Sequence, residues 1–272
     1  MKKAAYILTA VLIAGSVLFS GCGTGEQQVL LTYKFNPEKI FHYNFDSNSK
    51  TTMYENDKLV HRSEKLRHVL YSQETISIID SSKANVLFTY SSKDGSAPET
   101  WSNEFVMSTD GRVVGFDLQN DSSGQSLDYF RKLMEQAAPV YPDESVSPGF
   151  SWNNTVKVLL ESGTTDATTT YKLKALVREA GYDCAVIEYK GTMLIPLSKG
   201  PDDAPDAVIK GTDKITVDGV TYFAYAEGII IKEQATSHLL REGTVDTKGR
   251  SIKFRVEEDR TTKTILTNIE QK

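Results

Sequence analysis

Apolar and polar residues alternate with a period of two through much of the chain, and no other feature limits its fold as strongly. Between residues 171 and 178, Tyr, Leu, Ala and Val occupy every second position, and residues 252–257 repeat the pattern. Such alternation places one face of an antiparallel sheet against a core and the other in water. Further candidate strands are residues 39–45, 74–80, 86–90, 113–118, 155–160, 220–226, 228–236 and 263–269. We therefore predict an all-β, mainly antiparallel fold.

Short glycine turns separate several candidate strands. Asp110-Gly111 and Asp218-Gly219 each lie between two apolar runs, and Lys248-Gly249-Arg250 precedes another. Glycine accepts the positive φ of a tight hairpin turn, so each of these sites predicts a hairpin. Strands joined in this way to their sequence neighbours would form a curved sheet or an open half-barrel, with two linked sheets as the alternative.

One segment follows a helical period instead. Leu127, Phe130, Met134 and Ala137 recur every three or four residues, and Pro139 ends the run. We predict one amphipathic helix at 125–138. The proline-containing linker 139–149 then separates two strand-rich halves, 29–138 and 150–272, of a β-rich domain that spans 29–272. The two halves show no residue-level repeat.

The N-terminus has the layout of a bacterial export signal. Lys2 and Lys3 precede an uncharged, mostly apolar run over residues 4–19, which is shorter than the roughly 20 residues that cross a bilayer as a helix. The run ends in Leu-Phe-Ser-Gly-Cys at 18–22, which resembles the lipobox of bacterial lipoproteins, with Phe19 where Leu is usual. An ordinary signal peptide with a chance cysteine is the alternative.

The lipobox resemblance implies a location as well as a modification. Residues 1–21 would be removed as a signal peptide, Cys22 would carry the acyl chains of a membrane anchor, and residues 22–28 would form a tether. Acyl chains contribute about 0.8 kcal/mol per buried methylene, so several of them hold a protein firmly on a membrane. The expected location is the cell envelope, facing the periplasm. Gly23 after the cysteine favours the outer over the inner membrane.

Charge and cysteine content narrow the classes of partner. Loss of residues 1–21 removes Lys2 and Lys3 and takes the net charge from −5 to −7. A mildly acidic chain argues against a nucleic-acid partner. Cys184 is the only cysteine beyond Cys22, so an acylated Cys22 leaves no intramolecular disulfide. We expect Cys184 to be a small buried apolar residue.

Residues 145–152, Ser-Val-Ser-Pro-Gly-Phe-Ser-Trp, resemble the Val-x-x-Gly-Asp-x-Trp signature of an uncharacterised family of bacterial lipoproteins (DUF6263-like), with Phe150 where Asp is common. Segments 31–35, 110–113, 171–174 and 228–231 also fit that family. This resemblance implies no known activity. An exported β-sheet protein with a helix is more distantly similar to the lipoprotein-carrier group, which by fold analogy implies binding of lipid or another hydrophobic ligand.

Residue patterns typical of catalysis or metal binding are weak. The four histidines do not form a metal-binding pair at helical spacing; they are His42, His61, His68 and His238. Asp202, Asp203 and Asp206 lack the bidentate Glu of a calcium loop. The acidic run 257–259 is best explained as a solvated face, and the chain has neither a Gly-x-Ser-x-Gly elbow nor a phosphate loop. We therefore expect no enzyme activity, cofactor or metal, and keep a hydrolase as a remote alternative.

Aromatic residues are the remaining candidates for function. Phe41, Tyr43 and Phe45 share one face of a strand, Tyr222 lies opposite Phe223 and Tyr225, and Trp152 follows the Pro-Gly turn. The same alternation would arise from a filled core or from the lining of an open cavity. The first case predicts a structural or partner-binding envelope lipoprotein. The second predicts binding of a hydrophobic ligand or lipid, which is the hypothesis we favour.

Overall fold

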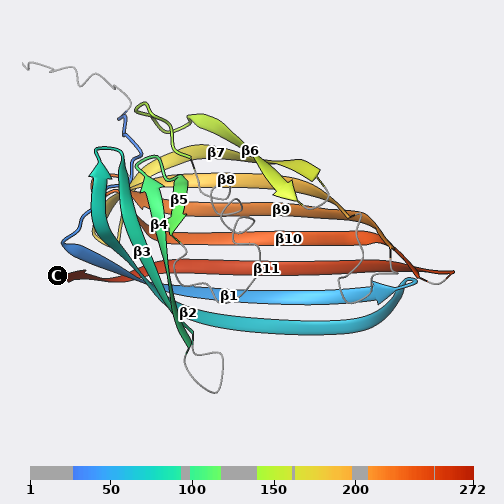
Figure 1. The fold of residues 1–272 in the computed structure, drawn as a ribbon. Helices are drawn as coiled ribbons and strands as arrows, with labels where there is room; N and C mark the ends of the chain where they lie inside the picture. Colours follow the sequence, from blue (N-terminus) through green and yellow to red (C-terminus); the bar gives the residue numbers. More distant parts are fainter. Residues whose placement is uncertain (1–26, 93–98, 118–139, 161–162, 198–207, 248) are drawn as a thin grey trace, which may run out of the picture.

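The computed structural model describes residues 27–92, 99–117, 140–160, 163–197, 208–247 and 249–272. These residues form one antiparallel sheet of eleven strands in the order β5-β4-β3-β2-β1-β11-β10-β9-β8-β7-β6 (Figure 1). The strands are β1 (Lys39–Glu55), β2 (Lys58–Asp80), β3 (Lys83–Ser92), β4 (Glu99–Ser108), β5 (Val113–Asp117), β6 (Ser151–Leu160), β7 (Gly163–Glu179), β8 (Tyr182–Leu197), β9 (Val208–Ala224), β10 (Ile229–Thr247) and β11 (Arg250–Gln271).

The sheet joins two meanders through one long-range strand pair. Strands β1 to β5 pair in sequence order, as do β6 to β11, and β1 then pairs with β11 from Lys39 opposite Gln271 to Glu55 opposite Phe254. The predicted all-β antiparallel fold is therefore confirmed. The alternative of two linked sheets is wrong, because this long pairing fuses both halves into one sheet.

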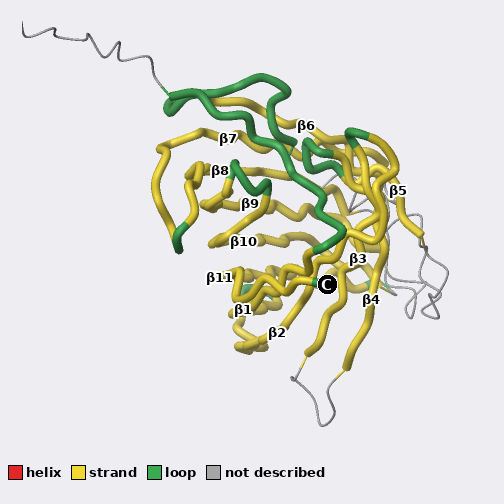
Figure 2. Tube along the Cα trace, turned by 90° about the vertical axis from the view of Figure 1, so that its left-hand side faces the viewer, coloured by secondary structure: helices red, strands yellow, loops and turns green. Residues whose placement is uncertain are grey.

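The sheet is open and strongly curved. Viewed along the strands, it bends into a C, with β3 to β5 at one end and β6 at the other turning toward the same side (Figure 2). The loop segments 27–38 and 140–150 cross this concave side, which we call the inner face, and we call the two segments the cover. An isolated bridge between Val29 and Val146 ties them together.

The structure tests the predicted turns individually. Asp110-Gly111 forms the β4–β5 turn, with Gly111 at φ 97°, and Gly249 lies between β10 and β11 at φ 78°. The hairpin predicted at Asp218-Gly219 is wrong, because β9 runs straight through both residues. Tight turns that we did not predict join β1 to β2 at Asn56-Asp57 and β7 to β8 at Ala180-Gly181, all with positive φ.

The core lies at one end of the long strands. One cluster packs the cover residues Leu31, Tyr33 and Tyr141 onto Leu173 and Phe223 of the sheet. A second surrounds Phe41, Tyr43 and Cys184, and a third includes Val86 and Phe105 on β3 and β4. Cys184 is fully buried, as we expected, and burial raises the pKa of its thiol to about 11.

The opposite ends of the strands are more polar and more exposed. Residues 58–68 of β2 are all exposed. An ion pair with a buried carboxylate supports this region: the guanidinium of Arg241 on β10 donates two hydrogen bonds of 2.7 Å to Asp213 on β9, whose side chain is buried. The long strands therefore extend well beyond the apolar core.

Several predictions fall on residues outside the described ranges. They are the signal peptide 1–21, Cys22 and most of the tether, the helix at 125–138, and the loop with Asp202, Asp203 and Asp206. Among the residues that are described, no helix is long and apolar enough to cross a membrane.

Candidate ligand site

Strand register defines which side chains share the inner face, because directly paired residues point to the same side of a sheet. A row across the middle of the sheet runs Leu173, Ile187, Thr221, Glu233, Thr264, Phe45 and Val69, each paired with the next. The next row runs Tyr171, Tyr189, Gly219, Ala235, Thr262, Ser47 and Arg67. Small side chains thus occupy the centre of the second row, and aromatic ones occupy its β7–β8 end.

Two cross-strand ladders of aromatic rings flank this centre. On one side Trp152, Tyr171 and Tyr189 are consecutive partners on β6, β7 and β8, with ring centroids 5.3 and 6.0 Å apart. We call these three residues the β6–β8 ladder. Stacked or tilted rings at such distances attract one another, and this attraction adds to the free energy gained by burying their apolar surface.

On the other side Tyr43, Tyr71, Tyr90 and Trp101 are consecutive partners on β1 to β4. Their ring centroids lie 4.8, 5.8 and 5.4 Å apart. We call them the β1–β4 ladder. Tyr43 is buried whereas Trp101 is 42% exposed, so this ladder runs from the core to an exposed aromatic surface.

Glu233 lies on the floor between the two ladders. The hydroxyl of Tyr189 donates a hydrogen bond of 2.7 Å to its Oε1, and Thr221 on the adjacent strand also hydrogen-bonds its carboxyl group. Surrounding protein atoms desolvate the carboxylate and raise the pKa of Glu233, an effect that the two hydrogen bonds oppose. Glu233 nevertheless keeps partial access to open space.

That open space is a cavity of about 270 Å³ between the sheet and the cover. Its lining consists of Tyr33, Tyr141, Tyr171, Ile187, Tyr189, Thr221, Ile230 and Glu233. Tyr33 stacks on Tyr141 with centroids 5.6 Å apart, and their hydroxyl groups share a hydrogen bond. Burial raises the pKa of both phenols well above the ordinary value, so they stay neutral. The cavity thus combines one carboxyl group with four tyrosine side chains.

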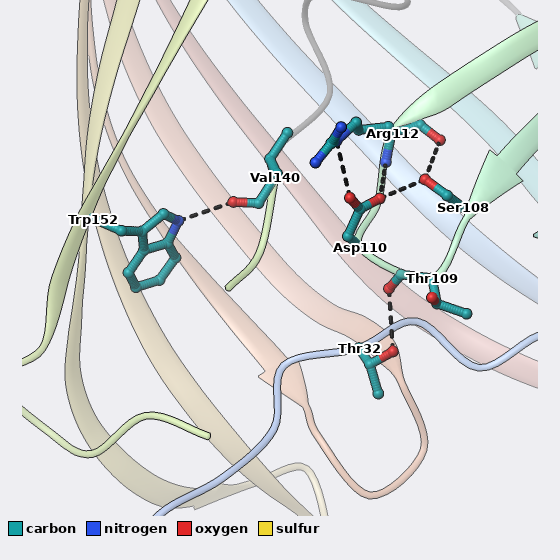
Figure 3. A network of polar contacts seen from close by, with 7 residues as sticks. All are labelled: Thr32, Ser108, Thr109, Asp110, Arg112, Val140 and Trp152. Carbon is teal, nitrogen blue, oxygen red and sulfur yellow. Dashed lines mark hydrogen bonds and ion pairs between the residues drawn. The ribbon is translucent and has the colours of Figure 1, made fainter. Parts of the chain in front are cut away.

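A polar network holds the cover over this cavity (Figure 3). The indole Nε1 of Trp152 donates to the carbonyl of Val140 at 2.9 Å, and the amide of Tyr141 donates to the carbonyl of Asp110 at 3.0 Å. Asp110 in turn pairs with Arg112 at 2.9 Å. Because Trp152 belongs to the β6–β8 ladder, the ladder is tied directly to the segment that covers the cavity.

A larger hollow of about 1130 Å³ lies halfway along β1, β2 and β8 to β11. Its lining includes most of the second inner-face row, namely Tyr189, Gly219, Ala235, Thr262, Ser47 and Arg67. It also includes the strand neighbours of these residues, whose side chains point to the opposite face, among them Asp46, His68, Lys190, Asp218 and Lys263. Lys190 and Asp218, which are direct partners on β8 and β9, form an ion pair of 3.0 Å. Tyr189 lines both this hollow and the smaller cavity that Glu233 borders.

The structure separates the four histidines rather than gathering them. His42, His68 and His238 contact the carboxylates of Glu270, Asp46 and Asp259 respectively, at 2.7 to 3.0 Å. His61 and His68 lie on opposite faces of β2. Within the described part of the chain, no three His, Cys, Asp or Glu side chains are arranged to hold a metal ion.

The aromatic residues singled out in the sequence divide between core and site. Phe41, Tyr43 and Phe223 are buried, and Trp152 belongs to the β6–β8 ladder. Glu233 was missed, because it is one polar residue in a strand that alternates in any case. The signal that could have found it is its position on the apolar side of β10, in register with Thr221 and Thr264.

Comparisons with known proteins add little to this picture. No family model matches the chain, and no curated protein matches it. One solved structure, described as "Lipid-protein interactions in lipovitellin", is similar with a TM-score of 0.45 and 12% sequence identity. The match covers 88% of this chain and 26% of the lipovitellin chain, so this chain spans about a quarter of that protein.

Proposed function

We propose that the protein is an acylated lipoprotein of the bacterial cell envelope that binds a hydrophobic ligand or lipid on the inner face of its sheet. Cys22 is the lipid anchor, and the β-rich domain faces the periplasm from the outer membrane. Binding is non-enzymatic, and we assign no catalytic residue.

The binding proposal rests on an unfilled cavity on the inner face that Tyr171 and Tyr189 of the β6–β8 ladder line, together with the β1–β4 ladder on the same sheet. Protein interiors are normally packed with few voids larger than a water molecule. Here a space of about 270 Å³ remains next to Tyr171 and Tyr189. The exposed ring of Trp101 continues the aromatic surface out of the core. Small-molecule sites are typically lined by aromatic and other apolar side chains, with a small number of polar groups among them.

Native mass spectrometry of the chain starting at Gly23, purified without detergent from a bacterial host, tests the binding proposal. We expect a retained mass that matches a lipid and disappears on unfolding. Trp101→Ala should weaken retention, whereas Tyr54→Ala, which removes a ring that packs on Arg255 far from the ladders, should not. A clean apo mass after addition of phospholipid would contradict the proposal and favour the partner-binding lipoprotein.

The anchor is tested separately by the intact mass of the protein from the membrane fraction. We expect a chain that begins at Cys22 and carries the mass of its acyl chains. Cys22→Ala should leave an unacylated chain with residues 1–21 still attached. A wild-type chain that is cleaved elsewhere and carries no acyl mass would contradict the anchor.

A further inference from the structure

Glu233 presents an unusual charge arrangement on the inner face. Its carboxyl group borders the cavity and receives hydrogen bonds from Tyr189 and Thr221, both of which are neutral donors. Within the described part of the chain, no Lys, Arg or His forms an ion pair with it. Taking a carboxylate out of water without a counter-charge is costly. A cation placed in the cavity would offset that cost.

The nearest basic residue along the strand points away. Lys232 precedes Glu233 on β10 and therefore lies on the opposite face, where its Nζ is 3.7 Å from Glu179 and 5.0 Å from the ring centroid of Tyr222. The next row of the inner face carries Ala235 between Gly219 and Thr262, none of which is charged. The described neighbours of Glu233 thus supply hydrogen bonds but no positive charge.

The rest of the cavity wall is suited to an organic cation. Tyr33, Tyr141, Tyr171 and Tyr189 supply four rings around the space that Glu233 borders. Aromatic rings attract ammonium groups, most strongly when these are desolvated, and rings around a cation are a common means of recognising quaternary ammonium ligands. We propose that this cavity binds an organic ammonium group, with Glu233 as its counter-ion and the tyrosines as its aromatic wall.

The size of the cavity indicates what part of a ligand it would hold. At about 270 Å³ it is slightly smaller than the 300–1,000 Å³ typical of sites for drug-sized molecules, so it suits a headgroup rather than a whole lipid. Ethanolamine and choline headgroups of phospholipids and free small amines share the required chemistry. The lipid case rests on the proposed function, with the acyl chains lying on the aromatic surface beyond the cavity.

Binding measurements with defined probes test this inference. The chain starting at Gly23 is titrated with short-chain phosphatidylethanolamine, phosphatidylcholine or phosphatidylglycerol below their micelle concentrations, and separately with ethanolamine or tetramethylammonium. Glu233→Gln removes the counter-ion but keeps the side-chain shape. Glu242→Gln is the matched control, because Glu242 is exposed and lies on the same strand but on the opposite face.

We expect the ethanolamine and choline lipids to bind at least tenfold more tightly than phosphatidylglycerol, and Glu233→Gln to abolish that preference while Glu242→Gln keeps it. Equal binding of all lipids by the wild type and Glu233→Gln would overturn the ammonium inference and leave the proposed function standing. If the free amines bind in a Glu233-dependent manner but no lipid does, the ammonium site is upheld and the lipid proposal fails. Absence of binding to any probe would overturn both.

Discussion

The ring of Tyr189 on β8 lies directly over Gly219, its partner on β9. A Cβ atom built on Gly219 would overlap the Cζ and hydroxyl oxygen of that ring. The glycine that resembled a hairpin turn in the sequence is therefore a mid-strand residue that makes room for an aromatic side chain. The hydroxyl of the same side chain donates the hydrogen bond to Glu233. Because Gly219 has no side chain, the Tyr189 ring can occupy this position and form one wall of the cavity.

Gly219→Ala should displace the Tyr189 ring and weaken its hydrogen bond to Glu233. We expect a loss of about 1–3 kcal/mol in the free energy of unfolding, the usual cost of overpacking. Urea unfolding provides the measurement. In a Tyr189→Ala background the same glycine change should cost much less, because the overlapping atoms are gone. Equal costs in both backgrounds would contradict the described contact.

Tyr189→Phe should remove the hydrogen bond to Glu233 and keep the ring stack with Tyr171. Hydrogen bonds to charged groups contribute about 1.5–3 kcal/mol, so we expect a loss of that order at neutral pH. The loss should shrink when Glu233 is also changed to Gln. The single substitution Tyr189→Phe should also raise the pKa of Glu233 further, because the lost hydrogen bond stabilises the carboxylate. NMR titration of the carboxyl carbon would detect this as a titration midpoint at higher pH.

Glu233→Gln should change how stability depends on pH. Burial raises the pKa of Glu233 above its ordinary value of 4.5, so the folded protein holds this proton more tightly than the unfolded chain. The resulting contribution to stability is complete below pH 4.5 and is lost as pH rises through the folded-state pKa. Gln resembles the protonated form and keeps the contribution. The stability of Glu233→Gln relative to the wild type should therefore increase with pH above 4.5.

Urea unfolding of both proteins between pH 4 and pH 8 tests this dependence, with Glu242→Gln as an exposed control whose difference from the wild type should stay small. A Glu233→Gln difference that is flat or falls with pH would show that the folded-state pKa is not raised.

Arg241→Ala should be far more damaging than loss of an exposed lysine from an ion pair. Its partner Asp213 has a side chain only 6% exposed and would lose both hydrogen bonds. Removing one member of a buried pair leaves a buried charge without compensation, and since Arg241 is partly exposed we expect a loss of about 2–4 kcal/mol. Lys253→Ala, which breaks an exposed pair with Asp57, should cost about 0–1 kcal/mol. Similar costs for the two variants would contradict the burial of Asp213.

Cys184 should be inert in the folded protein. The chain starting at Gly23 has no other cysteine, and the thiol is fully buried with a pKa raised to about 11 from an ordinary 9. The smaller thiolate fraction alone should slow its reaction with a disulfide reagent by on the order of 100-fold. Stopped-flow labelling at pH 8 with and without urea measures the difference. Fast labelling of the native protein would show that this part of the core opens.

Sequence reasoning predicted the sheet best where one face is buried. Residues 39–45 and 171–178 alternate clearly because their inner side chains pack in the core. The stretch 58–68 of β2 was missed, because all its side chains are exposed and its apolar residues, Leu59, Val60 and Leu66, do not recur with a period of two. The long pairing of β1 with β11 could not be predicted, because strands this far apart in sequence meet only through tertiary packing.

The candidate site was harder to predict than the fold. Glu233, Tyr189 and Gly219 come from three strands, and only the register places them together. The hairpin prediction at Asp218-Gly219 was wrong because both residues pair with β8 on one side and β10 on the other, and this pairing outweighs the local turn preference. A prediction based only on residues that are neighbours along the chain carries no information about contacts between strands.

The most direct test of ligand binding on the inner face is residue-resolved crosslinking with a photoactivatable phospholipid. Neighbouring residues of β8 point to opposite faces, so one strand reports on both: Ile187 and Tyr189 border the aromatic cavity on the inner face, whereas the side chains of Glu188 and Lys190 point to the opposite face. We expect crosslinks at Ile187 and Tyr189, together with Trp101 at the exposed end of the β1–β4 ladder. Crosslinks confined to Glu188 and Lys190, or none above an unrelated control protein, would contradict binding on the inner face.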